Sequence, residues 1–570
     1  MSAEARCDLA RTGLGILLLS LIGIACGKTS QNVPSTGQQA GNHAGGNGPG
    51  GVASAGSSLG GSGSTGTGAT GTGGNEQLSR VDLPGVPIYT RVQRLTNSQW
   101  ENAVADILLF REPHALAAQF TRPPRWVTAF DNNERILFVD SESFVDFESG
   151  AEAAAALATG STPALAALYK GDDALGFVRT LGRRAFRRPL TVSEETKYEG
   201  VFALGERLYG AGFANGAALV IRAMLQSPHF LYRTELGPEG DPLNPYELAS
   251  KLSFWLLGTT PSDALLDAAA AGKLASEDEL VAIARQMLEE PRAAAVMRDF
   301  HSQLLGVEGL QNIRKERQPE YDAAINPELE LASKAFFDFI FSSNFGLREL
   351  LTSTQAYVGP RLAPLYGAKP VAGDLELRDI GPSRKGYFMQ IPFLVRWGEA
   401  EPNPLQRGWS LTNTVLCASP GSIESVPLPA VPPDRTNRQS ITAYTEGCGG
   451  VCHRYIEPLG FALENFDSLG RERELDHGLP IDTTASFPFA EGVAQFADGA
   501  ELMTIISRSA QAHTCYSKHV TSYALGRDVV ESDRPLLESL AKVSLSHSLK
   551  DLVIALVRDP AFRTRKAGVP

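Results

Sequence analysis

The chain has no surplus of basic residues. Its 570 residues include 52 Lys and Arg against 64 Asp and Glu, a formal net charge of -12. Binding to the phosphates of nucleic acid needs a basic face, so this balance argues against a nucleic-acid partner. After the N-terminus no stretch is long and apolar enough for a further membrane span. The sequence beyond residue 85 also lacks a Gly-x-Ser-x-Gly elbow and a phosphate-binding loop.

Cysteine is scarce, with six in the whole chain. Two lie in the N-terminal segment, and the other four all fall in the last third. In an exported chain an even number favours disulfides, a metal or a covalent cofactor over free thiols. The four are Cys417, Cys448, Cys452 and Cys515.

The N-terminus has the pattern of an export signal. Arg6 and Arg11 precede a short apolar run, residues 14–24, which is too short to span a bilayer as a stable helix. Small residues then lead to Cys26, as in a bacterial lipobox. This pattern predicts a signal over residues 1–26 and a lipid on Cys26 that anchors the protein to a membrane, in the periplasm or on the cell surface. An ordinary secretory signal cut nearby is the alternative.

Within residues 27–85, the stretch from residue 29 to about residue 74 is mostly Gly, Ser, Thr, Ala and Asn, with almost no large apolar side chain. Such a segment buries too little surface to offset its ordering entropy, which predicts a disordered tether. About 490 residues follow, enough for several packed domains.

The body is predicted to be mainly α-helical. Thr96 with Gln99, and Thr191 with Glu194, have the spacing of capping boxes, and Asn244 precedes a further amphipathic run. Beyond Gly359 proline and glycine increase, which predicts an irregular, cysteine-bearing C-terminal module. Within and after this module, helices are expected over 502–523 and 536–557.

The central motif is Cys448-Gly-Gly-Val-Cys452-His453. Two thiols followed directly by an imidazole can attach a c-type haem, with His453 ligating the iron. Three residues separate the thiols instead of the usual two, and Gly449 and Gly450 could adapt the loop. Five side chains are candidates for the distal ligand: Met389, Met503, His477, His513 and His519.

Two other readings of the motif remain open. Cys448 and Cys452 could close a small disulfide loop while Cys417 pairs with Cys515, as expected in an oxidising compartment. Zinc held by Cys448, Cys452, His453 and one further ligand is the third reading, although no second paired motif is present.

A hydrolytic site has weaker support. Glu464 and Asp467 stand three residues apart on a predicted helix, so both could face one pocket as acid and base. Capping or ion pairing with Arg471 or Arg473 is the more common role of such a pair. His229 and His301 are expected to be hydrogen-bonded core residues.

An arginine cluster offers a possible anion-binding surface. A solvated helix face whose cations pair with nearby acids is the expected structure. The cluster consists of Arg179, Arg183, Arg184, Arg187 and Arg188.

Motifs in order along the body resemble an exported bacterial family built from domains of unknown function 1587, 1595, 1592, 1588 and 1585. The stretches that carry the resemblance are 94–100, 185–191, 226–233 with 248–256, 404–417 with the Cys448 motif and its Pro-Leu-Gly-Phe tail, and 523–527. The family name supplies no activity, but relatives that carry Cys-x-x-Cys-His imply a haem by association.

The resemblance divides the body into five segments. Two functions stay open: an electron carrier or redox subunit with a redox partner, and a cell-surface protein that binds a glycan or a partner through a body with structural disulfides. Whether the protein is an enzyme is left open. The segments are 86–165, 166–236, 237–370, 371–492, which carries the cysteine motif, and 493–570.

Overall fold

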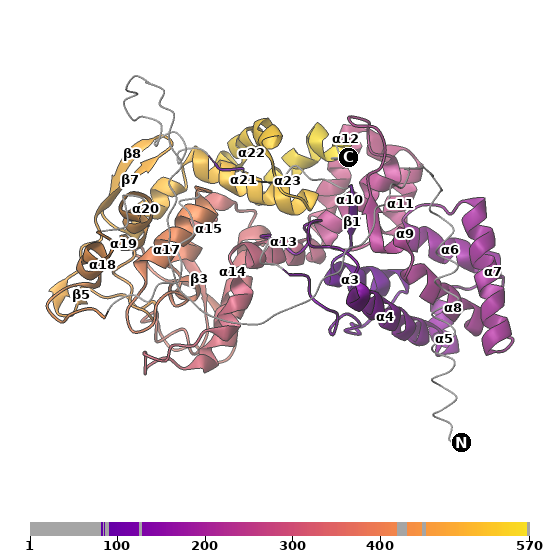
Figure 1. The fold of residues 1–570 in the computed structure, drawn as a ribbon, viewed down its shortest axis with the longest axis horizontal. Helices are drawn as coiled ribbons and strands as arrows, with labels where there is room; N and C mark the ends of the chain where they lie inside the picture. The colour runs from indigo at the N-terminus through magenta and orange to yellow at the C-terminus, as the bar shows by residue number, and fades with distance from the viewer. Residues whose placement is uncertain are drawn as a thin grey trace, which may run out of the picture. The chain divides into compact units, whose positions relative to one another are not determined.

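The structure is a computed structural model that describes residues 81–83, 85, 91–124, 128–418, 430–446 and 452–566, except for the side chains of 452 and 453. The described residues belong to one compact unit, and they are mainly helical, as predicted (Figure 1). None of the helices in the described ranges combines the length and apolarity needed to cross a membrane.

Several helices begin at the capping residues that the sequence indicates. The Thr96 hydroxyl accepts the Gln99 N–H at 3.1 Å, and the Gln99 side chain accepts the Thr96 N–H at 3.2 Å. Asn244 and Glu247 form the same reciprocal pair at the next predicted start. That helix ends at Gly258, whose φ of 64° is a left-handed conformation that favours glycine.

The first part of the body closes on itself through a two-stranded antiparallel sheet. Strand β1 pairs with β2, with Val92 opposite Thr234, so the start and the end of this part meet. A hydrophobic cluster that includes Trp100, Phe177 and Phe230 fills the space between its helices. The elements are β1 (Val92–Arg94), α3 (Asn97–Ile107), α4 (Ser141–Thr159), α5 (Thr162–Leu168), α6 (Ala174–Phe186), α7 (Val192–Tyr209), α8 (Phe213–Leu225), α9 (Pro228–Leu231) and β2 (Tyr232–Thr234).

The middle part is a helical array followed by an antiparallel pair of strands. Helix α10 serves two cores, because Phe254 joins the first cluster while Leu252 and Leu256 join a second. The elements are α10 (Pro245–Leu257), α11 (Asp263–Ala270), α12 (Glu277–Met287), α13 (Pro291–Leu304), α14 (Asn326–Ser342), α15 (Leu347–Thr352), β3 (Gln355–Val358) and β4 (Glu376–Asp379). Short 3₁₀ turns lie at Lys273–Ala275, Val307–Asn312, Ala323–Ile325, Tyr387–Met389 and Glu531–Asp533.

The last part combines short helices, two π-helical turns and two hairpins. Its elements are α16 (Ile391–Leu394), α17 (Pro404–Ser410), the π-helix Leu411–Val415, α18 (Asn437–Thr445), the π-helix Cys452–Ile456, α19 (Glu457–Phe461), β5 (Leu475–Asp476), β6 (Leu479–Pro480), β7 (Ala485–Phe489), β8 (Gly492–Phe496), α20 (Gly499–Ile506), α21 (Ala510–Leu525), α22 (Arg534–Ser546), α23 (Leu549–Arg558) and α24 (Pro560–Arg563).

Two predicted helices are each broken in two, so those predictions were wrong. The run 502–523 divides into α20 and α21, and 536–557 divides into α22 and α23. In both cases a serine caps the second helix: the Ser509 hydroxyl accepts the Ala512 N–H, and the Ser548 hydroxyl accepts the Asp551 N–H. Serine competes for backbone partners in this way, which favours a new start over a continuous helix.

The segment expected to be irregular contains regular hairpins. Strands β7 and β8 pair antiparallel with Ala485 opposite Phe496. Phe487 and Phe489 alternate inward on β7 and are buried, as on a half-buried strand.

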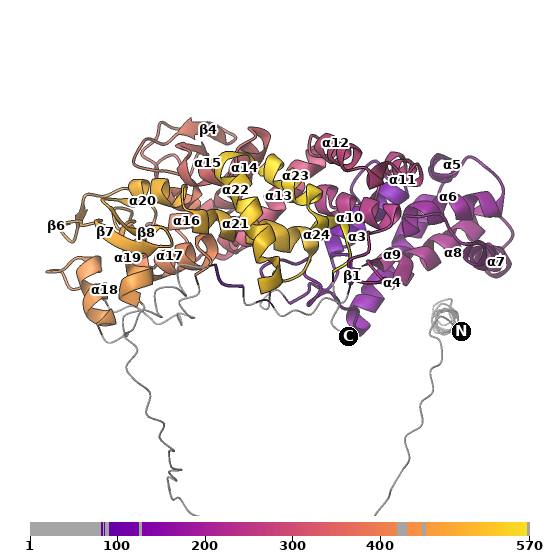
Figure 2. The same cartoon turned by 90° about the horizontal axis from the view of Figure 1, so that it is seen from above.

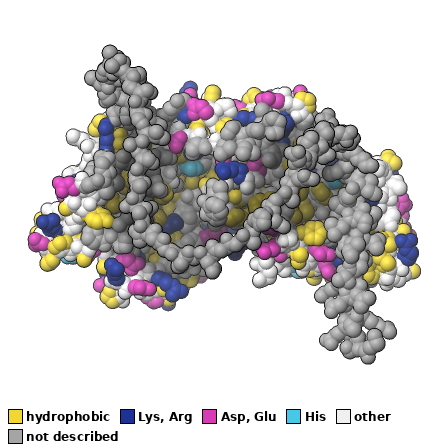
Figure 3. All heavy atoms as spheres, in the orientation of Figure 1, with side chains coloured by type: hydrophobic (Ala, Val, Ile, Leu, Met, Phe, Trp, Pro, Cys, Tyr) yellow, Lys and Arg dark blue, Asp and Glu magenta, His cyan; other side chains and the backbone are white. Residues whose placement is uncertain are grey.

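The C-terminal helices return to the middle of the chain. Helix α23 contacts α12, and α21 contacts both α10 and α13, as Figures 1 and 2 show. A second large hydrophobic cluster therefore draws residues from 130 to 562. The five segments thus share two large cores among the described residues. Acidic and basic side chains are interspersed over the visible part of the face in Figure 3.

Candidate functional site

The cysteine motif lies at the edge of the described structure. Cys448 is outside the described residues. Cys452 and His453 begin the π-helix Cys452–Ile456, but their side chains are not described. Their partners therefore stay predictions. The next residues, Tyr455 and Ile456, are buried and lead directly into α19.

Close backbone contact holds α19 against α17. A Cβ atom on Gly408 would collide with the carbonyl oxygen of Ile456, and one on Gly460 would collide with that of Pro404. The Thr412 hydroxyl also donates to the Tyr455 carbonyl at 2.7 Å. Only glycine permits this approach, so these contacts fix the backbone directly after His453.

A buried guanidinium holds the turn that follows α19. Arg407 is fully buried and donates to the carbonyl oxygens of Leu463 at 3.0 Å and Phe466 at 2.8 Å. It donates as well to the carbonyls of Asp467 at 2.8 Å and Leu394 at 3.2 Å. Burial lowers the pKa of Arg407 to about 10, and the side chain stays protonated at neutral pH. Arg407 is therefore a structural clamp that sequence analysis missed.

Glu464 is a buried carboxyl beside this clamp. Its Oε2 accepts from Asn437 Nδ2 at 3.0 Å and lies 3.7 Å from Arg473 Nη2. Its Oε1 has no hydrogen-bond partner among the described residues. Burial raises the pKa of Glu464 to about 7, so the neutral acid is populated near physiological pH.

Asp467 has a different set of partners. Its side chain accepts the backbone N–H groups of Leu469 and Arg471 at 2.8 Å and the Arg471 Nε–H at 2.7 Å. Glu464 instead faces Asn437, so the two carboxyls share no side-chain hydrogen-bond partner in the described structure. The expected capping and ion pairing account for this pair, and the geometry gives no acid–base site.

A second cluster could in principle hold a metal ion. His477 Nε2 lies 3.1 Å from a Glu401 oxygen and 3.9 Å from an Asp476 oxygen. His477 and Gly478 form a two-residue hairpin turn with φ values of 51° and 79°. Arg473 already donates to Asp476 at 2.6 Å, so its guanidinium supplies positive charge to this cluster.

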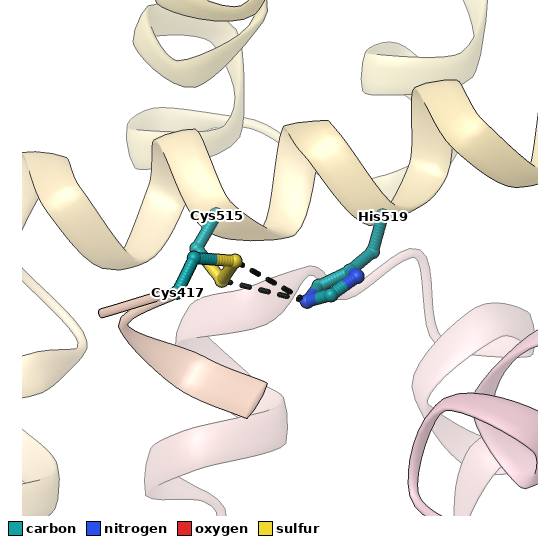
Figure 4. A group of neighbouring side chains, drawn as sticks. All are labelled: Cys417, Cys515 and His519. Atoms are coloured by element: carbon teal, nitrogen blue, oxygen red, sulfur yellow. Dashed lines mark hydrogen bonds between the residues drawn. A yellow bond between two sulfur atoms is a disulfide. The ribbon is translucent and has the colours of Figure 1, made fainter. Parts of the chain in front are cut away.

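The structure brings Cys417 and Cys515 together as a disulfide, with Cα atoms 5.4 Å apart (Figure 4). Both are buried, and Val81 packs against them. His519 Nε2 lies 3.5 Å from each sulfur and 3.1 Å from the Thr414 carbonyl oxygen. Burial lowers the pKa of His519 to about 3, so its imidazole is neutral. Because the sulfurs are bonded to each other, this cluster is a covalent link between two segments and not a metal site.

Three of the five candidate distal ligands are buried, His519 is half-buried and His477 is exposed. Met389 and Met503 lie in the second core, and Met389 Sδ accepts the Lys385 N–H at 3.4 Å. Both ring nitrogens of His513 have partners, Ser544 and the Ser507 carbonyl. His519 lies beside the disulfide, and His477 pairs with Glu401. None of these contacts identifies a distal ligand.

The two histidines expected in the core differ. His301 is fully buried, with Met297 O at 2.8 Å from Nδ1 and the Tyr516 hydroxyl at 2.9 Å from Nε2, which confirms the prediction. His229 is exposed and lies 3.4 Å from a Glu194 oxygen, so its prediction was wrong. It follows Pro228 at the exposed start of the short helix α9.

The arginine cluster is occupied by partners, as expected. Arg179, Arg184 and Arg188 each pair with a carboxylate at 2.8 Å, and Arg183 pairs with Asp267. Arg187 is the exception to the solvated face, because it is buried and donates to the backbone carbonyls of residues 229, 230 and 232.

Five family models match the chain in sequence order. Each is described as a protein of unknown function, and the model that matches residues 384–476 has the short name PSCyt3. The matches are DUF1587 over 93–160, DUF1595 over 173–235, DUF1592 over 243–368, DUF1588 over 384–476 and DUF1585 over 493–562. Searches of curated proteins and of solved structures gave no match. The chain therefore belongs to the family of multi-domain proteins in which these five domains of unknown function follow one another.

Proposed function

We propose that this protein is an exported, lipid-anchored electron carrier or redox subunit with a c-type haem on Cys448 and Cys452. The observation that carries the proposal is the donor set: two thiols followed directly by the His453 imidazole, within the stretch that matches PSCyt3. Thiols form the thioether links of such a haem, and imidazole is its usual proximal ligand. The bound haem would supply reversible one-electron transfer.

The chain's own residues have a positioning role in this proposal. Gly408 and Gly460 allow α17 and α19 to touch, and Thr412 holds the carbonyl of Tyr455. The backbone that follows His453 is thereby fixed to a buried framework. A rigid attachment keeps the reorganisation of a ligand small, which suits electron transfer.

Export and anchoring are part of the proposal. The predicted signal over 1–26 and the lipid on Cys26 lie outside the described residues. The Cys417–Cys515 disulfide supports an oxidising compartment, where such links persist. The anchored protein would exchange electrons with a redox partner at the membrane. Its formal net charge of -12 argues against nucleic acid as a partner.

The test is a haem stain on a denaturing gel, together with an absorbance spectrum, for the full chain made in a host with active c-type haem maturation. We expect a stain that survives denaturation and a Soret band. His453→Ala should shift the Soret band because the iron loses its imidazole. His229→Ala is the control, an exposed histidine outside the cysteine domain that lies beside Glu194 and is not a candidate ligand, and it should leave the spectrum unchanged. A colourless wild-type protein from that host would overturn the proposal.

A further inference from the structure

A cavity of about 270 Å³ with both polar and apolar lining lies where four family domains meet, and Arg233 is the part that the DUF1595 segment supplies. It is distinct from the cysteine motif. The DUF1587 segment supplies Asp131 and Asn132, α13 of the DUF1592 segment supplies Asp299, and α21 of the DUF1585 segment supplies Tyr523. No single family domain could form this site, so it belongs to the assembled body.

Two carboxylates lie close together at this cavity. Gln303 Nε2 donates to Asp131 at 3.0 Å and to Asp299 at 2.7 Å, so one amide nitrogen bridges them. The Tyr523 hydroxyl donates to the same Asp299 oxygen at 3.0 Å. These contacts fix the positions of both carboxyls before any ligand arrives, which lowers the entropic cost of binding.

The Asp299 side chain lines the cavity and is exposed to solvent there. The surrounding protein, and secondly the nearby Asp131 carboxylate, raise the pKa of Asp299 to about 6. Because solvent reaches this carboxyl through the cavity, a small ligand can reach it as well.

A second observation points to a ligand. Asn132 is only 7% exposed and lines the same cavity, yet its Oδ1 has no hydrogen-bond partner among the described residues. Its Nδ2 donates to the Tyr523 carbonyl at 2.7 Å, which fixes the amide. Leaving a buried acceptor unpaired costs free energy, and a hydroxyl group in the cavity would satisfy it.

The mixed lining selects the chemistry. Two arginines, Arg233 and Arg292, line the cavity together with the two carboxylates. Arg292 is held by Asp106 at 2.8 Å, and the Gln303 amide lies between the carboxylates. The Gln303 amide already bridges the two carboxylates, so no metal ion is needed to hold them together. The negative charges of Asp131 and Asp299 would repel a bound anion. Groups that donate and accept together fit this lining best, and hydroxyls are such groups.

We propose that this cavity binds one sugar unit, with Asp131 and Asp299 accepting hydrogen bonds from its hydroxyls. The volume lies just below the ~300–1,000 Å³ of drug-sized ligand sites, which suits a single ring. Trp255 and Phe254 contribute apolar lining. An adjoining hollow of about 490 Å³ shares Thr96, Ser98 and Asp131, so a second unit could continue into it.

The test is isothermal titration calorimetry on the full chain with D-glucose, D-galactose, D-xylose and N-acetyl-D-glucosamine, each up to millimolar concentrations. We expect saturable binding of at least one. Asp299→Asn should weaken it about tenfold or more, the usual effect of losing one charge-assisted hydrogen bond. Ala295→Phe, which fills the cavity from α13, should abolish it.

Asp278→Asn is the matched control, an exposed acid on α12 outside the cavity, and it should leave the affinity unchanged. Thermal unfolding checks that each variant is folded, and Ala295→Phe keeps the test decisive if Asp299→Asn fails to fold. The proposal is overturned if no sugar of the panel binds, or if binding survives both cavity variants. It is also overturned if Ca²⁺ binds instead and Asp299→Asn removes that binding, which would make this a cation site.

Discussion

The two cysteine pairs of the C-terminal region differ in spacing and in surroundings. Cys417 and Cys515 are separated by 98 positions in the chain and are bonded in a buried cluster with Val81. Cys448 and Cys452 are separated by only three residues in the sequence, and His453 follows them directly. A distant pair closes a long loop and ties two segments together, whereas a close pair followed by histidine has the donors of a cofactor site.

The number of cysteines alone therefore does not assign a structural or a cofactor-binding role to either pair. Both pairs fit an oxidising compartment, but only Cys448 and Cys452 are followed directly by a histidine in the sequence. His519, the imidazole beside the distant pair, is half-buried and neutral and lies against the Thr414 carbonyl. Cys417 and Cys515 form a covalent link between two segments, and we propose Cys448 and Cys452 as the haem attachment; the following changes separate these roles.

The largest expected effect comes from Cys448→Ser combined with Cys452→Ser. All covalently bound haem should be lost, because no thioether link can form. The stain on a denaturing gel measures this loss. A colour that survives denaturation in the double variant would contradict the assignment.

The converse change is Cys417→Ser combined with Cys515→Ser. It should lower the free energy of unfolding by roughly 2–5 kcal/mol, because the unfolded chain regains a long open loop. Urea unfolding measures the change, and the haem stain should be retained. An unchanged free energy of unfolding would contradict the stabilising role of this disulfide, and a lost stain would show that the two pairs are not separate in function.

A smaller effect is expected at the buried acid near the cysteine motif. The pKa of Glu464 is raised from 4.5 to about 7 in the folded protein. Between these values the folded state keeps a proton that the unfolded chain releases, so the free energy of unfolding falls as pH rises.

Glu464→Gln removes this dependence and should raise the free energy of unfolding at pH 8 by at most roughly 3 kcal/mol. Urea unfolding at pH 5 and pH 8 measures it. Glu474→Gln is the control, an exposed acid of the same segment. Equal pH profiles for Glu464→Gln and the wild type would show that this carboxyl stays ionised.

The smallest effect is expected where residues 81–83 cover the disulfide. The Asp82 N–H donates to the Cys417 carbonyl at 3.0 Å, and Lys518 donates to the Asp82 carbonyl at 2.8 Å. Val81→Ala should cost roughly 1 kcal/mol of stability and speed reduction of Cys417–Cys515 by dithiothreitol. Thiol labelling over time measures the rate. Equal rates in both proteins would mean that Val81 does not shield the sulfurs.

Local signals predicted much of the helical fold. Capping residues such as Thr96 and Asn244 act within one turn, so the sequence contains the whole signal. The breaks at Ser509 and Ser548 were missed although the same chemistry produces them, because apolar periodicity continues across both. The β7–β8 hairpin depends on Phe487 and Phe489 meeting the second core, which is a tertiary cause.

The sites that arise from distant contacts could not be read in advance. Asp131 and Asp299 stand far apart in the sequence and meet through Gln303. Nothing in the local sequence distinguishes Arg407 from a surface arginine. Its role follows only from the four carbonyl groups that surround it in the fold. Cysteine and histidine spacing, by contrast, is local, which is why the motif at Cys448 could be recognised.

The most direct test of the account is mass spectrometry of the tryptic peptide that carries Cys448 and Cys452, from protein made with active c-type haem maturation. We expect a peptide heavier by one haem, bound at both thiols. A peptide two hydrogens lighter than the free dithiol would contain a disulfide. Unmodified thiols would leave zinc binding as the remaining interpretation of the motif. Either result would contradict the central claim.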